Sequence, residues 1–166
     1  MNHICATLLV LCSLSLPTDE REMFAERIKE CAVIHNASYL APHERIPVTL
    51  VVAIAAHESG WGTSRFAVEG NNFFGIRTTE DDNYIIPRKN TKIRLATYLT
   101  ICDGVDSFME LLLNDYRYQG FVDELDSQWF LDVINYEKLI YNLDAFSTDR
   151  LWQRKILKII GQLDEI

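Results

Sequence analysis

The stretch that decides the fold runs from Pro47 to Ile76 and reads PVTLVVAIAAHESGWGTSRFAVEGNNFFGI. Residues 47–56 are apolar at almost every position, and a helix that is apolar all round is buried in a core. Glu58 stands at the end of this helix, and because an ionised carboxylate is costly to bury, we expect it to have a partner or to stay protonated. The glycines on either side of Trp61 predict a sharp turn that brings an indole beside this carboxyl. A protonatable carboxyl next to an aromatic face is typical of sugar-cleaving sites.

The run AHESGWGTSRFAVEGNNFFGI, residues 56–76, resembles the signature of the glucosaminidase domains of glycoside hydrolase family 73, and most of all its Bax-type branch. Segments 95–98, 106–108, 114–118 and 146–149 resemble further motifs of the same family, so the resemblance extends from about residue 16 to residue 160. It implies a mainly α, lysozyme-like α+β fold with a small β-hairpin lobe. It also implies hydrolysis, without a cofactor, of the β-1,4 bond after N-acetylglucosamine in peptidoglycan.

The resemblance implies that Glu58 is the general acid, but the second carboxylate of the family is replaced. Arg94 stands where many members have a glutamate before the aromatic residue that closes the hairpin. A base could come from the acidic cluster of Glu80, Asp81 and Asp82, which could equally be a solvated turn. The 2-acetamido group of the substrate could instead act as the nucleophile. The sequence does not distinguish between the acidic cluster and the acetamido group.

Further residues are candidates for contact with the glycan. The resemblance implies that the loop of residues 71–75 forms the floor of the cleft, with an asparagine that binds a sugar acetamido group or braces the acid. Two tyrosines match family positions that line the cleft, although each could be a partly buried core residue. The tryptophan of the signature is either a core anchor or a stacking platform. The predicted substrate-binding residues are Trp61, Asn72, Phe74, Tyr98 and Tyr118.

Local patterns predict the order of the elements. Capping residues and apolar periodicity indicate helices over residues 19–38, 47–60, 63–69, 103–116, 127–135 and from 147 onward. Residues 77–98 predict a β element of two or three strands. Trp129 and Trp152 lie on apolar faces of the last two helices, so we assign both to the core.

Composition narrows the class of protein. The chain has 166 residues, 48% of them apolar, which fits one globular domain. A net charge of −8 argues against nucleic-acid binding, which requires clustered lysine and arginine. The spacing of cysteine and histidine does not indicate a metal site. We therefore expect a monomer that binds a peptidoglycan strand by stacking and hydrogen bonds.

The N-terminus bears on localisation. Residues 1–16 contain an apolar run that is too short for a transmembrane span and predicts either a signal peptide or a buried N-terminal segment, followed by a catalytic domain over 17–166. Cys31 and Cys102 could form a disulfide in an oxidising compartment, or could be free cysteines of the core. We expect an exported, periplasmic or cell-envelope protein, or a phage-encoded lysis or virion protein.

Two rival functions remain from the sequence. A lytic transglycosylase shares the fold and needs a single acid, because it closes an anhydro ring instead of admitting water. The second rival is a glycan-binding module that has lost its base and does not catalyse a reaction. Arg94, at the position of the usual glutamate, is the main argument for that second rival.

Overall fold

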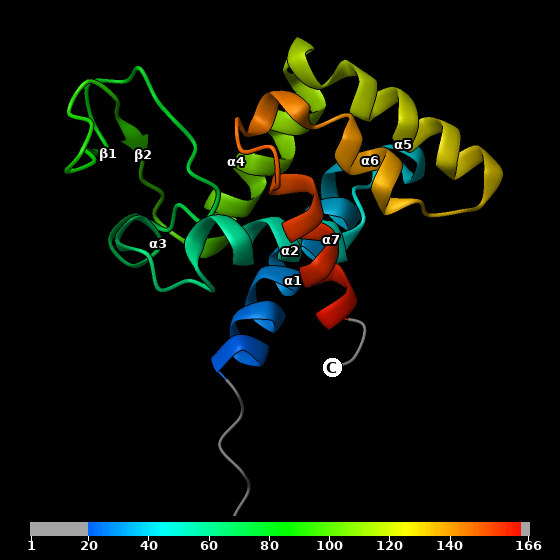
Figure 1. Ribbon diagram of the computed structural model, residues 1–166, viewed down its shortest axis with the longest axis horizontal. Coiled ribbons are helices and arrows are strands. Elements are labelled where there is room, and N and C mark those ends of the chain that lie inside the picture. Colours follow the sequence, from blue (N-terminus) through cyan, green and yellow to red (C-terminus); the bar gives the residue numbers. More distant parts are fainter. Residues whose placement is uncertain (1–19, 164–166) are drawn as a thin grey trace, which may run out of the picture.

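The computed structural model describes residues 20–163, so the predicted signal peptide or N-terminal segment at residues 1–16 lies outside the described residues. Within them the fold is mainly helical with one small antiparallel hairpin at its side, which confirms the predicted lysozyme-like fold class (Figure 1). The helices are α1 (Glu20–Tyr39), α2 (Val48–Ser59), α3 (Arg65–Gly70), α4 (Ile101–Asn114), α5 (Gln119–Leu131), α6 (Tyr136–Tyr141) and α7 (Trp152–Leu163). The strands are β1 (Tyr84–Ile85) and β2 (Leu95–Ala96), and short 3-10 turns cover Pro42–Glu44, Tyr116–Tyr118 and Asp144–Phe146.

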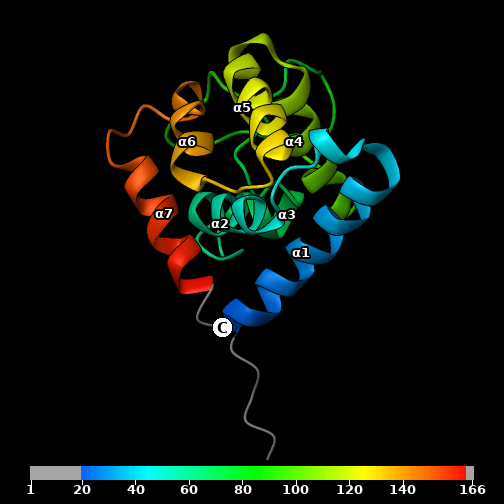
Figure 2. The same ribbon diagram turned by 90° about the vertical axis from the view of Figure 1, so that its right-hand side faces the viewer.

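Helix α2 lies at the centre of the molecule. Every residue from Leu50 to Ala56 is buried, as expected for a helix that is apolar all round. Figure 2 shows α2 between α1 on one side and α7 on the other, and these two helices make most of its contacts. The helix ends at Gly60, whose φ of 59° places it in the left-handed region and whose N–H donates to the carbonyl of Ala56. Glu58 is therefore carried to the surface at the point where the buried helix ends.

The hairpin lobe projects beside α3 (Figure 1). Tyr84 pairs with Ala96 and Ile85 with Leu95, and Arg77 forms an additional antiparallel bridge with Leu95. The lobe is thus short but has three backbone segments, in line with the predicted β element. The loop that leads into it lies directly on α4, because the backbone carbonyl of Asn71 occupies the space that a Cβ on Gly104 would need.

Two predicted helix starts are wrong. A helix was expected to begin at Ser127, but Ser127 lies inside α5, which starts eight residues earlier by continuing directly from the turn of Tyr116–Tyr118 without a side-chain cap. The last helix was expected to begin at Ser147, but α7 starts at Trp152 because Asp149 forms a turn first, accepting from the backbone N–H groups of Leu151 and Trp152.

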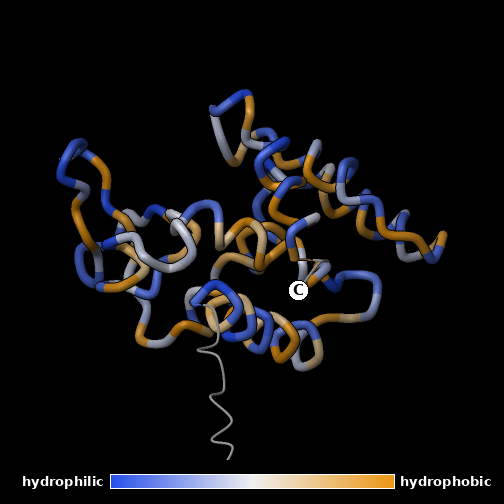
Figure 3. Tube along the Cα trace, turned by 60° about the horizontal axis from the view of Figure 1, so that its bottom comes forward, coloured by the Kyte–Doolittle hydropathy of each residue, from blue (hydrophilic) through white to orange (hydrophobic). Residues whose placement is uncertain are grey.

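The two tryptophans assigned to the core have different environments. Trp152 is buried, with 2% of its surface exposed, whereas Trp129 is 51% exposed. Phe130 and Leu131 are exposed next to Trp129, so hydrophobic residues reach the surface at the end of α5, at the right-hand side of Figures 1 and 3. None of the helices within residues 20–163 combines the length and the apolar character needed to cross a bilayer.

A disulfide joins α1 to α4. Cys31 and Cys102 are bonded with their Cα atoms 4.9 Å apart, so the predicted pairing is confirmed. Nearby, Nδ1 of the buried His35 lies 3.0 Å from a carboxylate oxygen of Asp106, which connects the same two helices. The disulfide closes a loop with a sequence separation of 71 that contains α2, α3 and the lobe.

Replacing both cysteines by serine, C31S/C102S, should lower the free energy of unfolding by about 2–5 kcal/mol, because the unfolded chain regains the freedom that the closed loop removes. Urea titration of the parent and the variant, each with and without a reductant, measures the difference. Addition of the reductant should destabilise the parent and leave the variant unchanged. A parent that is insensitive to the reductant under unfolding conditions would show that the bridge contributes no stability.

Candidate active site

Glu58 lines a cleft of about 500 Å³. The other walls are residues 74–77 of the loop that enters the lobe, Leu111 on α4, Arg117 and Tyr118 in the turn before α5, and residues 145–148. The end of the buried helix thus meets four other segments of the chain. The cleft is open to solvent on the side of Glu58, whose side chain is exposed.

The carboxylate of Glu58 has one defined partner. The indole Nε1 of Trp152 donates to Oε1 of Glu58 at 2.7 Å, across a sequence separation of 94. The expectation that Glu58 has a polar partner is therefore met, although its side chain is exposed. We assigned Trp152 only to the core, and the structure adds that its N–H reaches the cleft. One signal was available, because a buried indole N–H needs an acceptor.

Aromatic side chains form the inner wall of the cleft. Phe74 is buried and stacks on Phe108 with ring centroids 3.9 Å apart, and Phe146 packs edge-on against Phe108. Burial raises the pKa of the Tyr118 phenol above its ordinary value, so Tyr118 stays protonated over the neutral range. Of the predicted substrate-binding residues, Phe74 and Tyr118 are the two that line this cleft.

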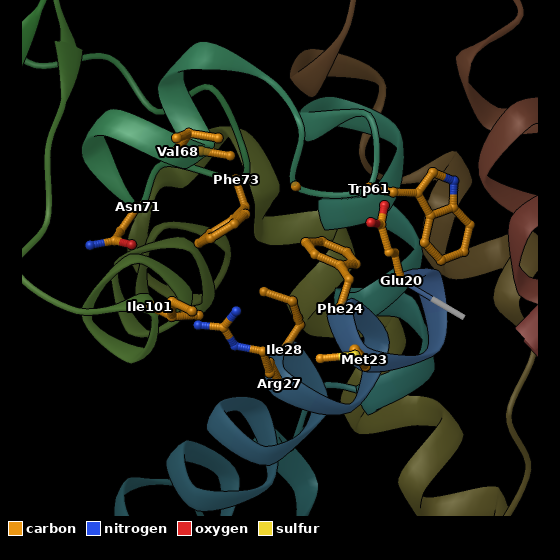
Figure 4. A pocket seen from close by; sticks show the side chains of 12 residues that line it. Glu20, Met23, Phe24, Arg27, Ile28, Trp61, Val68, Asn71, Phe73 and Ile101 are labelled. Atoms are coloured by element: carbon orange, nitrogen blue, oxygen red, sulfur yellow. The ribbon is translucent and has the colours of Figure 1, made fainter. Parts of the chain in front are cut away.

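Trp61 and Tyr98 lie elsewhere. Trp61 packs edge-on against Phe24, with the guanidinium carbon of Arg21 5.1 Å from its ring centre. It lines a separate pocket of about 340 Å³ between α1, α3 and the loop at residue 71 (Figure 4). The hydroxyl of Tyr98 is hydrogen-bonded to that of Ser107 on α4 at 2.8 Å, and burial raises the Tyr98 pKa. Neither residue borders the Glu58 cleft.

Asn72 braces the lobe. Its side chain is 2% exposed, and its amide nitrogen donates to the carbonyls of Ile76 and Ala96, each at 2.9 Å. Its amide oxygen accepts from the N–H of Ile76 at 3.0 Å. These bonds tie the loop before the cleft to strand β2. Asn72 therefore supports the wall of the cleft from behind, and it makes no hydrogen bond with Glu58.

Replacing Asn72 by alanine should lower the free energy of unfolding by about 1–3 kcal/mol, because the partly buried N–H of Ile76 and carbonyl of Ala96 lose their partner. The Ile76 amide should also exchange its hydrogen faster, since its acceptor is removed. Urea unfolding and hydrogen exchange measure these effects. The matched control is Asn114→Ala, which removes an exposed asparagine from the end of α4 and should change stability little. Equal stability of the two variants would contradict the bracing role.

The acidic cluster lies at the tip of the lobe. Arg94 donates to Asp81 at 2.7 Å and to the backbone carbonyl of Glu80 at 2.8 Å, and its guanidinium lies over the ring of Tyr84. The Asp81 side chain is 97% exposed, and Glu80 and Asp82 are exposed as well. None of these three carboxylates borders the cleft. Arg94 thus organises the tip of the lobe.

Charged side chains of both signs line the cleft. Among the described residues that line it, Glu58 is the one carboxylate, and Arg77 and Arg117 are cations. Arg117 binds Asp115 through Nε at 3.0 Å and Nη2 at 2.6 Å, which lowers the pKa of Asp115 to about 2. Across residues 20–163, three or more histidine, cysteine or acidic side chains do not gather into a group that could hold a metal ion.

A lysozyme-like fold with a carboxyl group at the end of a buried helix and in an open cleft is typical of enzymes that cleave glycosidic bonds. The family model described as mannosyl-glycoprotein endo-β-N-acetylglucosaminidase, or glucosaminidase, matches residues 34–165. The chain therefore belongs to the glucosaminidase family, and it is a glycoside hydrolase by that membership.

Similarities to individual proteins are consistent with this assignment. Protein bax of Escherichia coli (strain K12) is 53% identical over 32 residues, which are 19% of this chain and 12% of that protein. The catalytic domain of the autolysin Auto from Listeria monocytogenes has a TM-score of 0.68 at 17% identity, with 92% of this chain and 89% of that chain covered. A peptidoglycan hydrolase from Sphingomonas sp. A1 has a TM-score of 0.63 at 18% identity, covering 84% and 86%. At these identities the two structures show the shared fold, and the Bax-type resemblance of the sequence is confirmed.

Proposed function

We propose that this protein is a peptidoglycan hydrolase that cleaves the β-1,4 bond after N-acetylglucosamine, with Glu58 as the general acid. The observation that carries the proposal is the position of Glu58 in the cleft, with Oε1 held by Trp152. Within the described part of the chain, Oε2 has no hydrogen-bond partner. The proton needed by the leaving glycosidic oxygen is best placed on this free oxygen. The substrate class is supported by the family and by the named activity of the Sphingomonas hydrolase.

Trp152 has a positioning role in this mechanism. A carboxyl at the end of a flexible side chain must be held in one orientation to transfer a proton efficiently. The buried indole fixes Oε1 and leaves Oε2 without a hydrogen-bond partner among the described residues. The phenol of Tyr118, which also lines the cleft, is a donor for a sugar hydroxyl because it stays protonated.

The attacking group is the second part of the proposal. A base must be held within about 0.5 Å of its working position. The carboxylates of Glu80, Asp81 and Asp82 are exposed at the tip of the lobe, and Asp81 is already bound to Arg94. These features favour attack by the 2-acetamido group of the substrate over activation of water by the acidic cluster.

Two rivals are separated by their products. Because the described lining of the cleft contains a single carboxylate, a lytic transglycosylase remains a second candidate. Mass spectrometry of digested cell-wall fragments distinguishes the three functions. Hydrolysis as proposed leaves a reducing N-acetylglucosamine, a transglycosylase leaves an anhydro-muramic end, and a glycan-binding module leaves the strand uncut.

Replacing Glu58 by glutamine should reduce kcat by about 10²- to 10⁴-fold, because the amide cannot donate the proton. The variant should fold normally, with a melting temperature close to that of the parent, since the Glu58 side chain is exposed. Release of soluble fragments from purified peptidoglycan measures the rate. Glu69→Gln, an exposed glutamate on α3, is the matched control and should retain full activity. Activity of Glu58→Gln within twofold of the parent would remove Glu58 from the acid role.

Replacing Trp152 by phenylalanine should lower kcat by about 10- to 100-fold with little change in KM, because the ring still fills the core but no longer holds Oε1. The control is Trp129→Phe, which changes an exposed tryptophan outside the cleft. Steady-state kinetics and melting temperatures should be measured for both variants. A proportional loss of folded protein and activity would show that Trp152 acts only through stability.

We also propose that the protein works outside the cytoplasm, in the periplasm or cell envelope, or as a phage-encoded lysis or virion protein. The disulfide between Cys31 and Cys102 supports this location, because such bonds persist in oxidising compartments. The proposed substrate is found there as well. The expectations of a monomer and of a signal peptide at residues 1–16 stay predictions.

A further inference from the structure

The lining of the cleft is richer in cations than the protein as a whole. The chain carries a formal net charge of −8, yet two guanidinium groups and one carboxylate line the cleft. Guanidinium groups bind carboxylates through charge-assisted hydrogen bonds. A neutral glycan offers them no such partner.

Arg117 is held in a fixed orientation. Its Nε and Nη2 atoms bind the two carboxylate oxygens of Asp115. This pairing leaves Nη1 without a hydrogen-bond partner among the described residues. The side chain of Arg117 is 48% exposed, whereas that of Asp115 is 21% exposed. The guanidinium therefore keeps a free donor edge in the cleft, already oriented by its partner.

Arg77 is the second cation of the cleft. Its backbone is fixed by the bridge to Leu95, and it follows directly on Ile76, whose N–H and carbonyl are both bound by Asn72. Within residues 20–163 the Arg77 side chain has no ion-pair partner, in contrast to Arg94 on the same lobe. An exposed, unpaired arginine on an anchored backbone is well suited to bind a carboxylate with its planar fork of donors.

We propose that Arg77 and Arg117 form a carboxylate-binding subsite of the cleft, which recognises the acidic group on the sugar next to N-acetylglucosamine. This inference rests on the proposed function. N-acetylmuramic acid differs from N-acetylglucosamine by a lactyl ether, whose carboxyl group is either free or linked to a peptide that carries carboxylates of its own. The subsite therefore selects peptidoglycan over chitin-like glycans, which have the same β-1,4 linkage but no carboxylate.

Binding can be tested without turnover by using the Glu58→Gln protein. Calorimetry with three ligands measures the Kd: an uncharged N-acetylglucosamine tetramer, an alternating tetrasaccharide with free lactyl carboxylates, and the same tetrasaccharide with its peptides attached. We expect the acidic ligands to bind about tenfold more tightly than the uncharged tetramer at low salt, since hydrogen bonds between two charged groups are stronger. Tight binding of the free-lactyl ligand alone identifies the lactyl carboxylate, and tight binding of the peptide form identifies the peptide carboxylates.

Adding Arg77→Gln should reduce this preference about tenfold, and Arg77→Lys should restore part of it because the charge is kept without the fork. Arg88→Gln is the matched control, since Arg88 is an exposed lobe arginine that borders a different pocket. Equal affinity of the Glu58→Gln protein for all three ligands would overturn the subsite, as would a preference that survives both Arg77→Gln and Arg117→Gln. If the parent protein does not cleave peptidoglycan, the proposed function is contradicted. The binding experiment would still test the subsite.

Discussion

The burial of α2 is the constraint on which the rest of the structure depends. A helix without a polar face cannot lie at the surface, so α1 and α7 must cover it on both sides. After Thr49 in its first turn, its next polar residues are His57 and Glu58, where this enclosure ends. The carboxylate is therefore at the boundary between core and solvent because of the hydrophobic effect. The cleft forms where the covering segments meet around this helix end.

The parts of the fold that were predicted correctly have local signals. The run of apolar residues before Glu58 and the glycine at position 60 identify α2 and its end, because both depend on neighbouring residues alone. The disulfide followed from the count of cysteines outside the N-terminal segment. Phe74 and Tyr118 were placed at the cleft by their family motifs. Apart from the disulfide, the residues that carry the information lie close together in the chain.

The errors arose where hydrogen bonds and packing determine where a helix starts or where a side chain lies. Ser127 has the chemistry of a helix cap, but α5 starts earlier because it continues from the preceding turn. Asn72 was expected to bind a sugar acetamido group or to brace the acid, yet its side chain binds the backbone groups of Ile76 and Ala96. Trp61 faces α1 because Phe24 and Arg21 offer it a better surface than solvent. Capping chemistry and apolar periodicity do not encode these hydrogen bonds and ring contacts.

The hydrogen bond between Trp152 and Glu58 has a consequence for the order in which the protein is made. Its two residues are separated by 94 positions, so the ribosome produces the acid long before it produces the donor that orients it. Until α7 has been synthesised and has docked, one side of α2 lacks its cover as well. A nascent or prematurely terminated chain thus has the acidic residue but an incomplete cleft. The proposed catalytic site is therefore complete only after α7 has been translated and has docked.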